Sequence, residues 1–147
     1  MKEPLWIMSR AVLRMHDESL AEHGGPEGVR DLGALEAALG RPRNVFAYAE
    51  GDLTLFDLAA AYAYAIARSH PFVDGNKRTA AIASMAFLDR NGVRIAAPQP
   101  EVYMVFTRLA AGKTTEAEMA KWFERYAEPG IRSAAPPRRK PRRGGRK

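Results

Sequence analysis

The sequence predicts an all-α, single-domain fold, and three observations support this prediction. Apolar residues recur at helical spacing in one segment after another. Each segment is followed within a few residues by Gly, Pro or an Asn-Gly pair, and only Val93–Ile95 has any strand character, as a very short strand at most. With 147 residues, of which 46% are apolar, the chain can bury one ordinary core. We therefore expect one domain, and we find no internal repeat.

Two helices are expected in the first third of the chain. Ser9 can cap the first, and the run Gly24-Gly25-Pro26 stops it. Asp31 can cap a second, shorter helix over Leu35–Leu39. That helix should end at Gly40-Arg41-Pro42, because proline lacks the N–H that a helix interior uses.

The third and fourth expected helices flank a loop in the middle of the chain. The third begins after Asp52 and runs to Arg68-Ser69, with the strongest helical periodicity of the sequence. Its many alanines suggest close packing at the centre of the domain. The fourth begins near Asn76 and ends at Asn91-Gly92, which favours a left-handed stop. These two helices should therefore form the middle of the fold.

Two further helices are expected over Pro100–Ala110 and Thr115–Tyr126. Thr115 and Glu118 have the spacing of a capping box at the start of the second. Aromatic and aliphatic stripes, such as Tyr62 with Ile66, are interpreted as core, because apolar helical periodicity is packing far more often than a cofactor site.

Composition excludes several classes of site. The chain has no cysteine, so it has neither disulfides nor thiolate zinc sites. Its histidines, at 16, 23 and 70, form no local metal-ligand pattern, and His16 and His23 are assigned to helix packing and a helix end. No segment has the length and apolarity of a signal peptide or a membrane helix. A cytoplasmic protein without membrane contact is expected.

The net charge of +6 belongs to the end of the chain. Eight of the 23 Lys and Arg residues lie in residues 132–147, where there is no acid, so residues 1–131 carry 15 bases and 17 acids, a net charge of about −2. The last 16 residues are also rich in Pro and Gly, which favours disorder. We therefore expect a domain over 1–131 and a disordered basic tail over 132–147.

The loop between the third and fourth helices, His70–Arg78, is unlike the rest of the chain. Pro71 pushes the preceding residue out of the helical region and so ends the third helix, and Gly75 permits a sharp turn with positive φ. Asn76 fits the N-cap of the fourth helix. The free N–H groups of the first turn, with Lys77 and Arg78 beside them, then form an anion site suited to phosphates.

The remaining residues of the loop suggest chemistry on a bound phosphate. Asp74 is placed as a Mg²⁺ ligand, since Mg²⁺ takes one or two carboxylates together with substrate oxygens. His70 could act as general base on a hydroxyl, and Phe72 would anchor the loop in the core. Each residue alone also has a purely structural interpretation, as a cap or a solvated charge. Two bases in the first turn oppose the helix dipole, however, and a bound anion explains them.

The same loop resembles the signature His-x-Phe-x-Asp/Glu-Gly-Asn-Gly/Lys-Arg of Fic-domain proteins. Lys77 and Thr79 make it similar to the death-on-curing (Doc) branch, the toxins of toxin–antitoxin systems. The resemblance extends over about residues 5–127, through Met15-His16-Asp17, the stretch Gly28–Pro42, and Leu88–Gly92. It implies an all-helical fold in which the motif loop leads into a buried central helix.

The resemblance also implies roles for individual residues. His70 would be the general base and Asp74 the Mg²⁺ ligand. The residues expected to bind the phosphates of ATP are Arg68, Gly75, Asn76, Lys77 and Arg78.

Two departures from the AMP-transferring members of the family concern the reaction. Lys77 stands where their second glycine lies, and Ala81 stands where they have a second arginine. The resemblance to Doc therefore implies transfer of the γ-phosphate of ATP to a Ser/Thr hydroxyl of translation elongation factor Tu, which inhibits translation. Alternatives are protein adenylylation, and a non-catalytic helical module that binds nucleic acid through residues 132–147.

A separate inhibitor is also implied. The family's self-inhibiting helix carries Ser/Thr-x-x-x-Glu-Gly/Asn, and neither Glu27-Gly28 nor Glu50-Gly51 has Ser or Thr four positions before the glutamate. An antitoxin of the Phd type is the expected partner.

Overall fold

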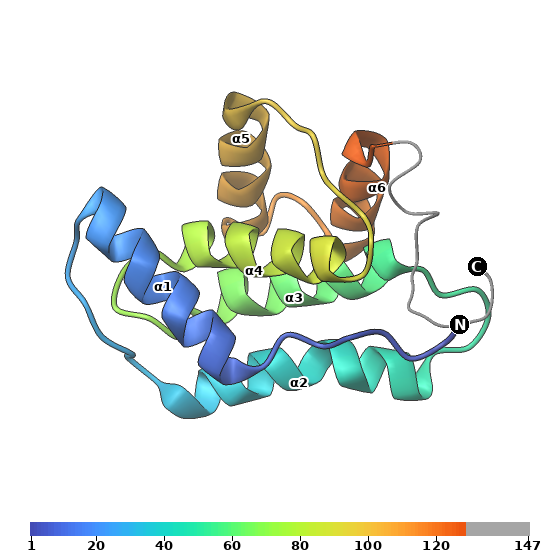
Figure 1. Cartoon of the computed structure of the whole chain (residues 1–147), viewed down its shortest axis with the longest axis horizontal. Helices are drawn as coiled ribbons and strands as arrows, with labels where there is room; N and C mark the ends of the chain where they lie inside the picture. The colour runs from blue at the N-terminus through green and yellow to red at the C-terminus, as the bar shows by residue number, and fades with distance from the viewer. Residues whose placement is uncertain (129–147) are drawn as a thin grey trace.

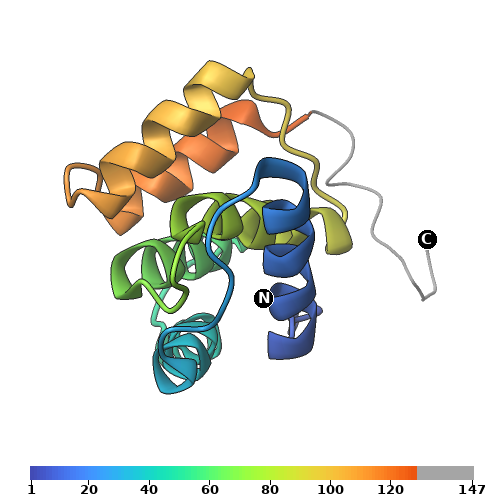
Figure 2. The ribbon, with the colours of Figure 1, turned by 90° about the vertical axis from the view of Figure 1, so that its left-hand side faces the viewer.

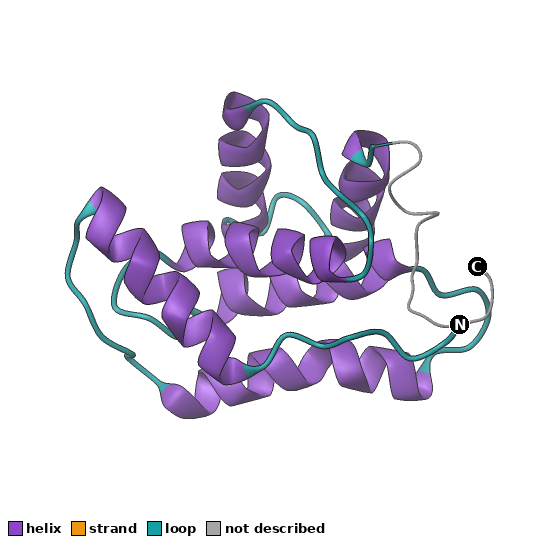
Figure 3. Cartoon of the chain, in the orientation of Figure 1, coloured by secondary structure: helices purple, strands orange, loops and turns teal. Residues whose placement is uncertain are grey.

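The computed structural model describes residues 1–128 and contains six helices in that range. The predicted basic tail, 132–147, lies outside the described residues. The helices, labelled in Figure 1, are α1 (Ser9–His23), α2 (Leu32–Tyr48), α3 (Leu55–Ser69), α4 (Asn76–Arg90), α5 (Gln99–Ala110) and α6 (Glu116–Tyr126). The rest of this part of the chain is loop (Figure 3). It contains two isolated β-bridges but no β-strand. The predicted all-α single-domain fold is confirmed.

The helices are arranged around α3 and α4, which lie side by side in the middle of the molecule (Figure 1). Helices α1 and α2 lie on one side of this pair, and α5 and α6 on the other, as the turned view in Figure 2 shows. The loop between α3 and α4 therefore emerges where the α1–α2 connection passes. This arrangement brings the two loops together at one end of the domain.

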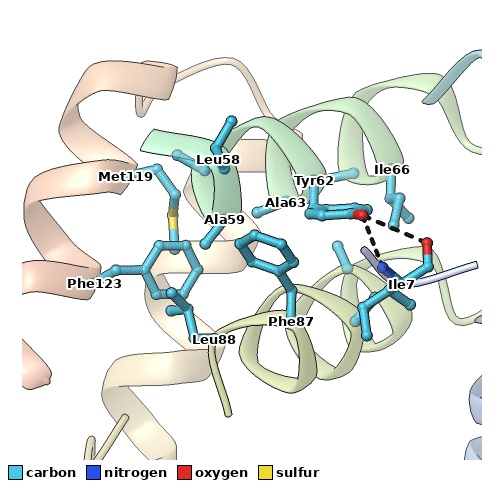
Figure 4. Packing of buried hydrophobic residues seen from close by; sticks show 14 of the residues in the cluster. Ile7, Leu58, Ala59, Tyr62, Ala63, Ile66, Phe87, Leu88, Met119 and Phe123 are labelled. Carbon is cyan, nitrogen blue, oxygen red and sulfur yellow. Dashed lines mark hydrogen bonds between the residues drawn. The ribbon is translucent and has the colours of Figure 1, made fainter. Parts of the chain in front are cut away.

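The core is centred on α3. Residues 58–63 of this helix are fully buried, and four of the six are alanines, which let neighbouring helices approach closely. Figure 4 shows side chains of α3, α4 and α6 meeting there. The labelled residues of the cluster are Ile7, Leu58, Ala59, Tyr62, Ala63, Ile66, Phe87, Leu88, Met119 and Phe123. The stripes interpreted as packing, Tyr62/Ile66 among them, are indeed core.

Tyr62 also ties the N-terminal segment to this core. Its hydroxyl accepts a hydrogen bond from the backbone N–H of Ile7 at 3.0 Å and donates to the carbonyl of the same residue at 3.4 Å (Figure 4). Burial raises the pKa of the Tyr62 phenol, and the Ile7 hydrogen bond and Arg43 oppose this only in part. The segment before α1 is thus fixed by a buried polar contact.

The prediction that the second helix ends at Gly40 is wrong. Asp31 does cap α2, accepting from the N–H of Ala34 at 3.0 Å, but the helix continues through Pro42 to Tyr48. An interior proline costs about 3 kcal/mol relative to alanine. Pro42, Leu35 and other α2 residues are buried, and α2 packs along α3. Tertiary packing therefore overrides the local stop signal.

The ends of α1, α4, α5 and α6 agree with the sequence to within one residue, whereas α2 begins at Leu32, three residues before the predicted start, and α3 begins at Leu55. The N-cap of α1 is Met8, so Ser9 is the first helical residue and makes no side-chain cap. The predicted capping box of Thr115 and Glu118 is confirmed at α6, and α3 has a second one, formed by Thr54 and Asp57. No helix within residues 1–128 is long and apolar enough to cross a membrane.

Candidate active site in the loop between α3 and α4

The motif loop has an unusual backbone at its first residue. Helix α3 ends at Ser69, and His70 follows in the left-handed region, with φ 49° and ψ 57°. Among the described residues other than glycine, only His70 has a positive φ. Such a conformation costs about 1–3 kcal/mol and persists only where surrounding contacts impose it. The predicted helix end is confirmed, and the observed strain marks His70 as a candidate functional residue.

Asn76 has a different role from the predicted N-cap. The N-cap of α4 is Gly75, with φ 79°, and no side chain caps the helix. The Asn76 side chain instead accepts a hydrogen bond from the N–H of Phe72 and donates one to the Phe72 carbonyl, both at 2.9 Å. It therefore closes the loop on itself. The reason is geometric: Gly75 makes the turn, so Asn76 is already helical and its amide points back.

The start of α4 is consequently open. The N–H groups of Asn76, Lys77 and Arg78 have no acceptor within residues 1–128. The first turn contains no acidic residue, and its two cations form no ion pair in the same range. One guanidinium nitrogen of Arg78, Nη1, is buried without any partner. Free N–H groups, the positive end of the helix dipole and an unsatisfied guanidinium all favour an anion here.

A strap formed by the α1–α2 connection holds the loop from outside. We use "strap" for residues 24–31, which pass beside the motif loop (Figure 2). The N–H of Val73 donates to the Gly28 carbonyl at 3.1 Å, and the N–H groups of Arg30 and Asp31 both donate to the Pro71 carbonyl, at 2.8 and 3.0 Å. The strap therefore pairs with the motif loop through backbone hydrogen bonds.

His16 contacts the loop from α1, which the sequence reasoning missed. The side chain is only 2% exposed, and its Nε2 lies 2.8 Å from the Asp74 carbonyl oxygen. The ring stacks on Phe72 with centroids 3.8 Å apart and planes at 10°. Because a carbonyl can only accept, Nε2 carries the proton. Phe72 itself is buried, so its predicted anchoring role is confirmed.

An open cleft of about 1130 Å³ lies over the motif loop, between α4 and α5. Six of the seven predicted site residues line it: His70, Asp74, Gly75, Asn76, Lys77 and Arg78. Ala81 also lines it, one helical turn beyond Lys77. Arg68 is not among the lining residues, since its guanidinium lies against Gly112 in the turn between α5 and α6. The structure thus brings the motif together around one cavity and leaves Arg68 outside it.

Asp74 fits a divalent cation only together with a bound phosphate. Its carboxylate makes no hydrogen bond or ion pair with any residue of the described part, and the side chain lines the cleft. No group of three or more His, Cys, Asp or Glu side chains suited to a metal occurs within residues 1–128. One carboxylate is nevertheless enough for Mg²⁺ when substrate oxygens and water complete the octahedron.

Gly25 of the strap lies directly against this carboxylate. A Cβ built on Gly25 would stand 2.5 Å from Oδ2 of Asp74, and the residue has φ 118°. Only glycine combines this backbone angle with so close an approach. The second glycine of the Gly24-Gly25 pair, which the sequence predicts to stop the first helix, therefore also shapes the site.

His23 and Glu22, at the end of α1, also line the cleft. The sequence assigns His23 to a helix end, and it does lie in the last turn of α1, where its Nδ1 is 3.1 Å from the Ser19 carbonyl. No local pattern predicts its place beside the motif loop, because that depends on how α1 crosses α4. The cleft thus contains a second imidazole.

The sequence is similar to those of one known protein family. The model of the Fic/DOC family matches residues 6–88, which include the whole motif loop. The chain belongs to the Fic/DOC family. It is 35% identical to the "Protein kinase doc" of Escherichia phage P1 over 119 residues, which cover 81% of this chain and 93% of the phage protein. It is 47% identical to the "Toxin Doc" of Mycolicibacterium smegmatis over 74 residues, covering 50% of this chain and 57% of that toxin.

These similarities define the coarse class of this family member. The matched region contains every predicted site residue, from Arg68 to Arg78. The family and the names of both relatives support a Doc-type toxin that is a nucleotide-using transferase. The expected resemblance to Doc is confirmed.

Proposed function

We propose that this chain is a Doc-type toxin kinase, which transfers the γ-phosphate of ATP to a Ser or Thr hydroxyl of a protein. The observation that carries the proposal is the open start of α4, where free N–H groups, Lys77 and the unsatisfied Arg78 face a cleft beside His70. The name of the phage relative, a protein kinase, supports the same reaction. The target we propose is translation elongation factor Tu, whose modification would inhibit translation.

In this mechanism the polar residues of the loop bind phosphate, remove a proton or hold a metal ion. The N–H groups at the start of α4, with Lys77 and Arg78, bind phosphate oxygens and stabilise the charge of the transferred group. His70 takes the proton of the attacking hydroxyl while its oxygen bonds to the γ-phosphorus and the bond from that phosphorus to the bridging β–γ oxygen breaks. ADP leaves with that oxygen. Asp74 would hold Mg²⁺ together with phosphate oxygens, and the ion would neutralise part of their charge.

Two residues of the cleft favour γ-phosphate transfer over adenylylation. Lys77 places a long cationic side chain where the AMP-transferring pattern has glycine, and Ala81 offers no cation where that pattern has arginine. An ATP bound with its phosphate tail along this helix would therefore lack the arginine contact at position 81, and the Lys77 side chain would obstruct it. A reversed nucleotide, with its γ-phosphate at the anion site, avoids both.

The activity of a toxin of this class implies an inhibitor, and we propose a separate antitoxin of the Phd type. The name of the mycobacterial relative supports a toxin–antitoxin system. The cleft beside the motif loop continues over apolar side chains of α4 and α5, including Ile82, Met85 and Phe106. A segment of the antitoxin docked there would cover the active site.

The direct test uses ATP labelled separately on the α- and the γ-phosphate, with purified elongation factor Tu and with cell lysate. We expect label on protein from γ only, in a Mg²⁺-dependent reaction that Asp74→Asn abolishes. Asp89→Asn, at the exposed far end of α4, is the matched control and should react like the wild type. Label from the α-phosphate would instead establish adenylylation and overturn the kinase proposal.

A further inference from the structure

We propose that two residues outside the signature, Arg30 and His16, are positioning residues with separate tasks in this site. Arg30 holds the backbone of His70, and His16 holds the Asp74–Gly75 turn and so keeps the anion site open. The proposal rests on the function proposed above, because it assigns His70 to catalysis and the start of α4 to nucleotide binding. It adds a division of labour that predicts different kinetic defects for the two residues.

Arg30 contacts the carbonyls at the end of α3 with its side chain. Its guanidinium donates from Nε to the His70 carbonyl at 2.8 Å, and from one terminal nitrogen to the carbonyls of His70 and Ser69 at 2.5 and 3.0 Å. These are orphan acceptors at the negative end of a helix dipole, where a cation is favourable. The planar guanidinium makes these three contacts from two nitrogens held in a fixed geometry, which the single, freely rotating ammonium of lysine does not reproduce.

The backbone around Arg30 adds to this hold. The backbone N–H groups of Arg30 and Asp31 both donate to the Pro71 carbonyl. Arg30 therefore donates hydrogen bonds to the carbonyls on both sides of the His70–Pro71 bond. Asp31 in turn caps α2, which fixes the end of the strap. Arg30 is an exposed residue, so it is not needed to fill the core. Its hydrogen bonds end on the strained His70 and on the residues directly before and after it.

The conformation of His70 explains why such a holder is needed. A non-glycine residue before proline prefers the extended region, and His70 is left-handed instead. If φ and ψ of His70 relaxed, its carbonyl would turn away from Arg30 and its imidazole would leave the cleft. The Arg30 hydrogen bonds are made to the His70 carbonyl as the left-handed conformation directs it, so they stabilise the conformer that presents the base.

His16 acts at the other end of the loop. The Asp74 carbonyl that it engages is four residues before Arg78, and a helix beginning earlier would use this oxygen to accept the Arg78 N–H. Nε2–H of His16 holds this carbonyl in place and Gly75 turns the chain, and the Arg78 N–H then has no acceptor within residues 1–128 and is free for an anion. The stacked His16 and Phe72 rings fix this arrangement in the core.

The two roles predict opposite patterns in the full-length protein. Arg30→Met, which keeps most of the side-chain stem but no donor, should lower the turnover rate about 10- to 100-fold with little change in the Kd for ATP, since a misplaced base affects only the chemical step. His16→Phe, which keeps a ring to stack but loses the donor, should weaken ATP binding about 3- to 10-fold. His16→Gln, whose side-chain amide can donate, should recover part of that binding.

The experiment measures transfer rates from α- and γ-labelled ATP, the Kd of ATP by calorimetry, and the melting temperature for each variant. Arg10→Met, an exposed arginine of α1 without such contacts, is the matched control and should behave as the wild type. Arg30→Lys should lie nearer to Arg30→Met than to the wild type.

The outcomes separate this proposal from the proposed function. Equal losses of turnover and ATP affinity in Arg30→Met and His16→Phe, in step with their melting temperatures, would mean a general structural role and overturn the division of labour. So would a failure of His16→Gln to bind better than His16→Phe. Transfer of the α-label by the wild type would overturn the kinase reaction, and the two variants would still test the division of labour on that reaction.

Discussion

The starts of α6 and α4 are built in opposite ways. At α6, Thr115 accepts from the N–H of Glu118 at 3.0 Å, and the Glu118 carboxylate accepts from the N–H of Thr115 at 2.8 Å. The first turn of α6 also carries two acids, which complement the helix dipole. At α4, glycine is the N-cap, the first turn has no acid, and Lys77 and Arg78 occupy positions that the dipole disfavours.

The difference shows what each helix start is for. The α6 start satisfies its own donors, so it contributes stability and has nothing left to bind a ligand. The α4 start leaves donors and cations unsatisfied, which costs stability unless an anion binds. A helix start that breaks the capping rules beside a cleft is therefore a better indicator of function than either cation alone.

The largest expected effect is at His70, which leads into the open start. His70→Ala should lower phosphate transfer about 10²- to 10⁴-fold, the usual contribution of a general base. The melting temperature and ATP binding should change little, because the side chain is exposed. Transfer from labelled ATP, calorimetry and thermal melting measure these three quantities. A fully active variant, or one that simply unfolds, would remove His70 from the mechanism.

Lys77→Gly is expected to have the next largest effect, and it tests whether the cation at the open start of α4 binds phosphate. Losing a charged contact to phosphate is worth about 1.5–3 kcal/mol, so γ-phosphate transfer should fall about 10- to 150-fold. Since the change restores the glycine of the AMP-transferring pattern, weak labelling from α-labelled ATP is expected, and Ala81→Arg should increase it. If the wild type already labels protein from the α-phosphate, Lys77 does not select the reaction.

The capped start of α6 should show the reverse behaviour. Thr115→Ala should lower the free energy of unfolding by about 1 kcal/mol, the usual cost of a lost N-cap, and leave phosphate transfer unchanged. Urea unfolding and the transfer assay measure the two. A loss of activity larger than the loss of folded protein would contradict the assignment of this helix start to stability.

The smallest expected effect is the pH dependence at the same cap. Two hydrogen bonds from Thr115 lower the pKa of the exposed Glu118 below its ordinary value of 4.5, and the bond from the Thr115 backbone has a larger effect than the one from its side chain. The contribution of Glu118 to stability is therefore present above pH 4.5 and is lost as the pH falls through the lowered pKa. Unfolding of Glu118→Gln, compared with wild type from pH 6 to pH 3, should lack this component. If Glu118→Gln has the same pH dependence of unfolding as the wild type, this component of the stability belongs to another carboxylate.

Several helix ends could be predicted because their signals lie within a few residues of one another. The periodicity of α3, the Asn91-Gly92 stop after α4 and the Thr115/Glu118 cap of α6 depend on residues within a few positions of one another, and the structure agrees with all three. The motif His70–Arg78 could also be identified, because its proline, glycine and paired cations have no purely structural explanation as a group. These features follow from local sterics and hydrogen bonding.

The remaining features depend on contacts between residues far apart in the sequence. Helix α2 runs through Pro42 because packing along α3 outweighs a local penalty that the sequence shows plainly. His16 and Arg30 lie 58 and 40 residues from the atoms that they hold, and no local pattern connects them. Their roles depend on α1 and the strap lying against the motif loop, which follows from how the helices share one core. The strained His70 is held by contacts from distant segments, so only the folded chain determines its conformation.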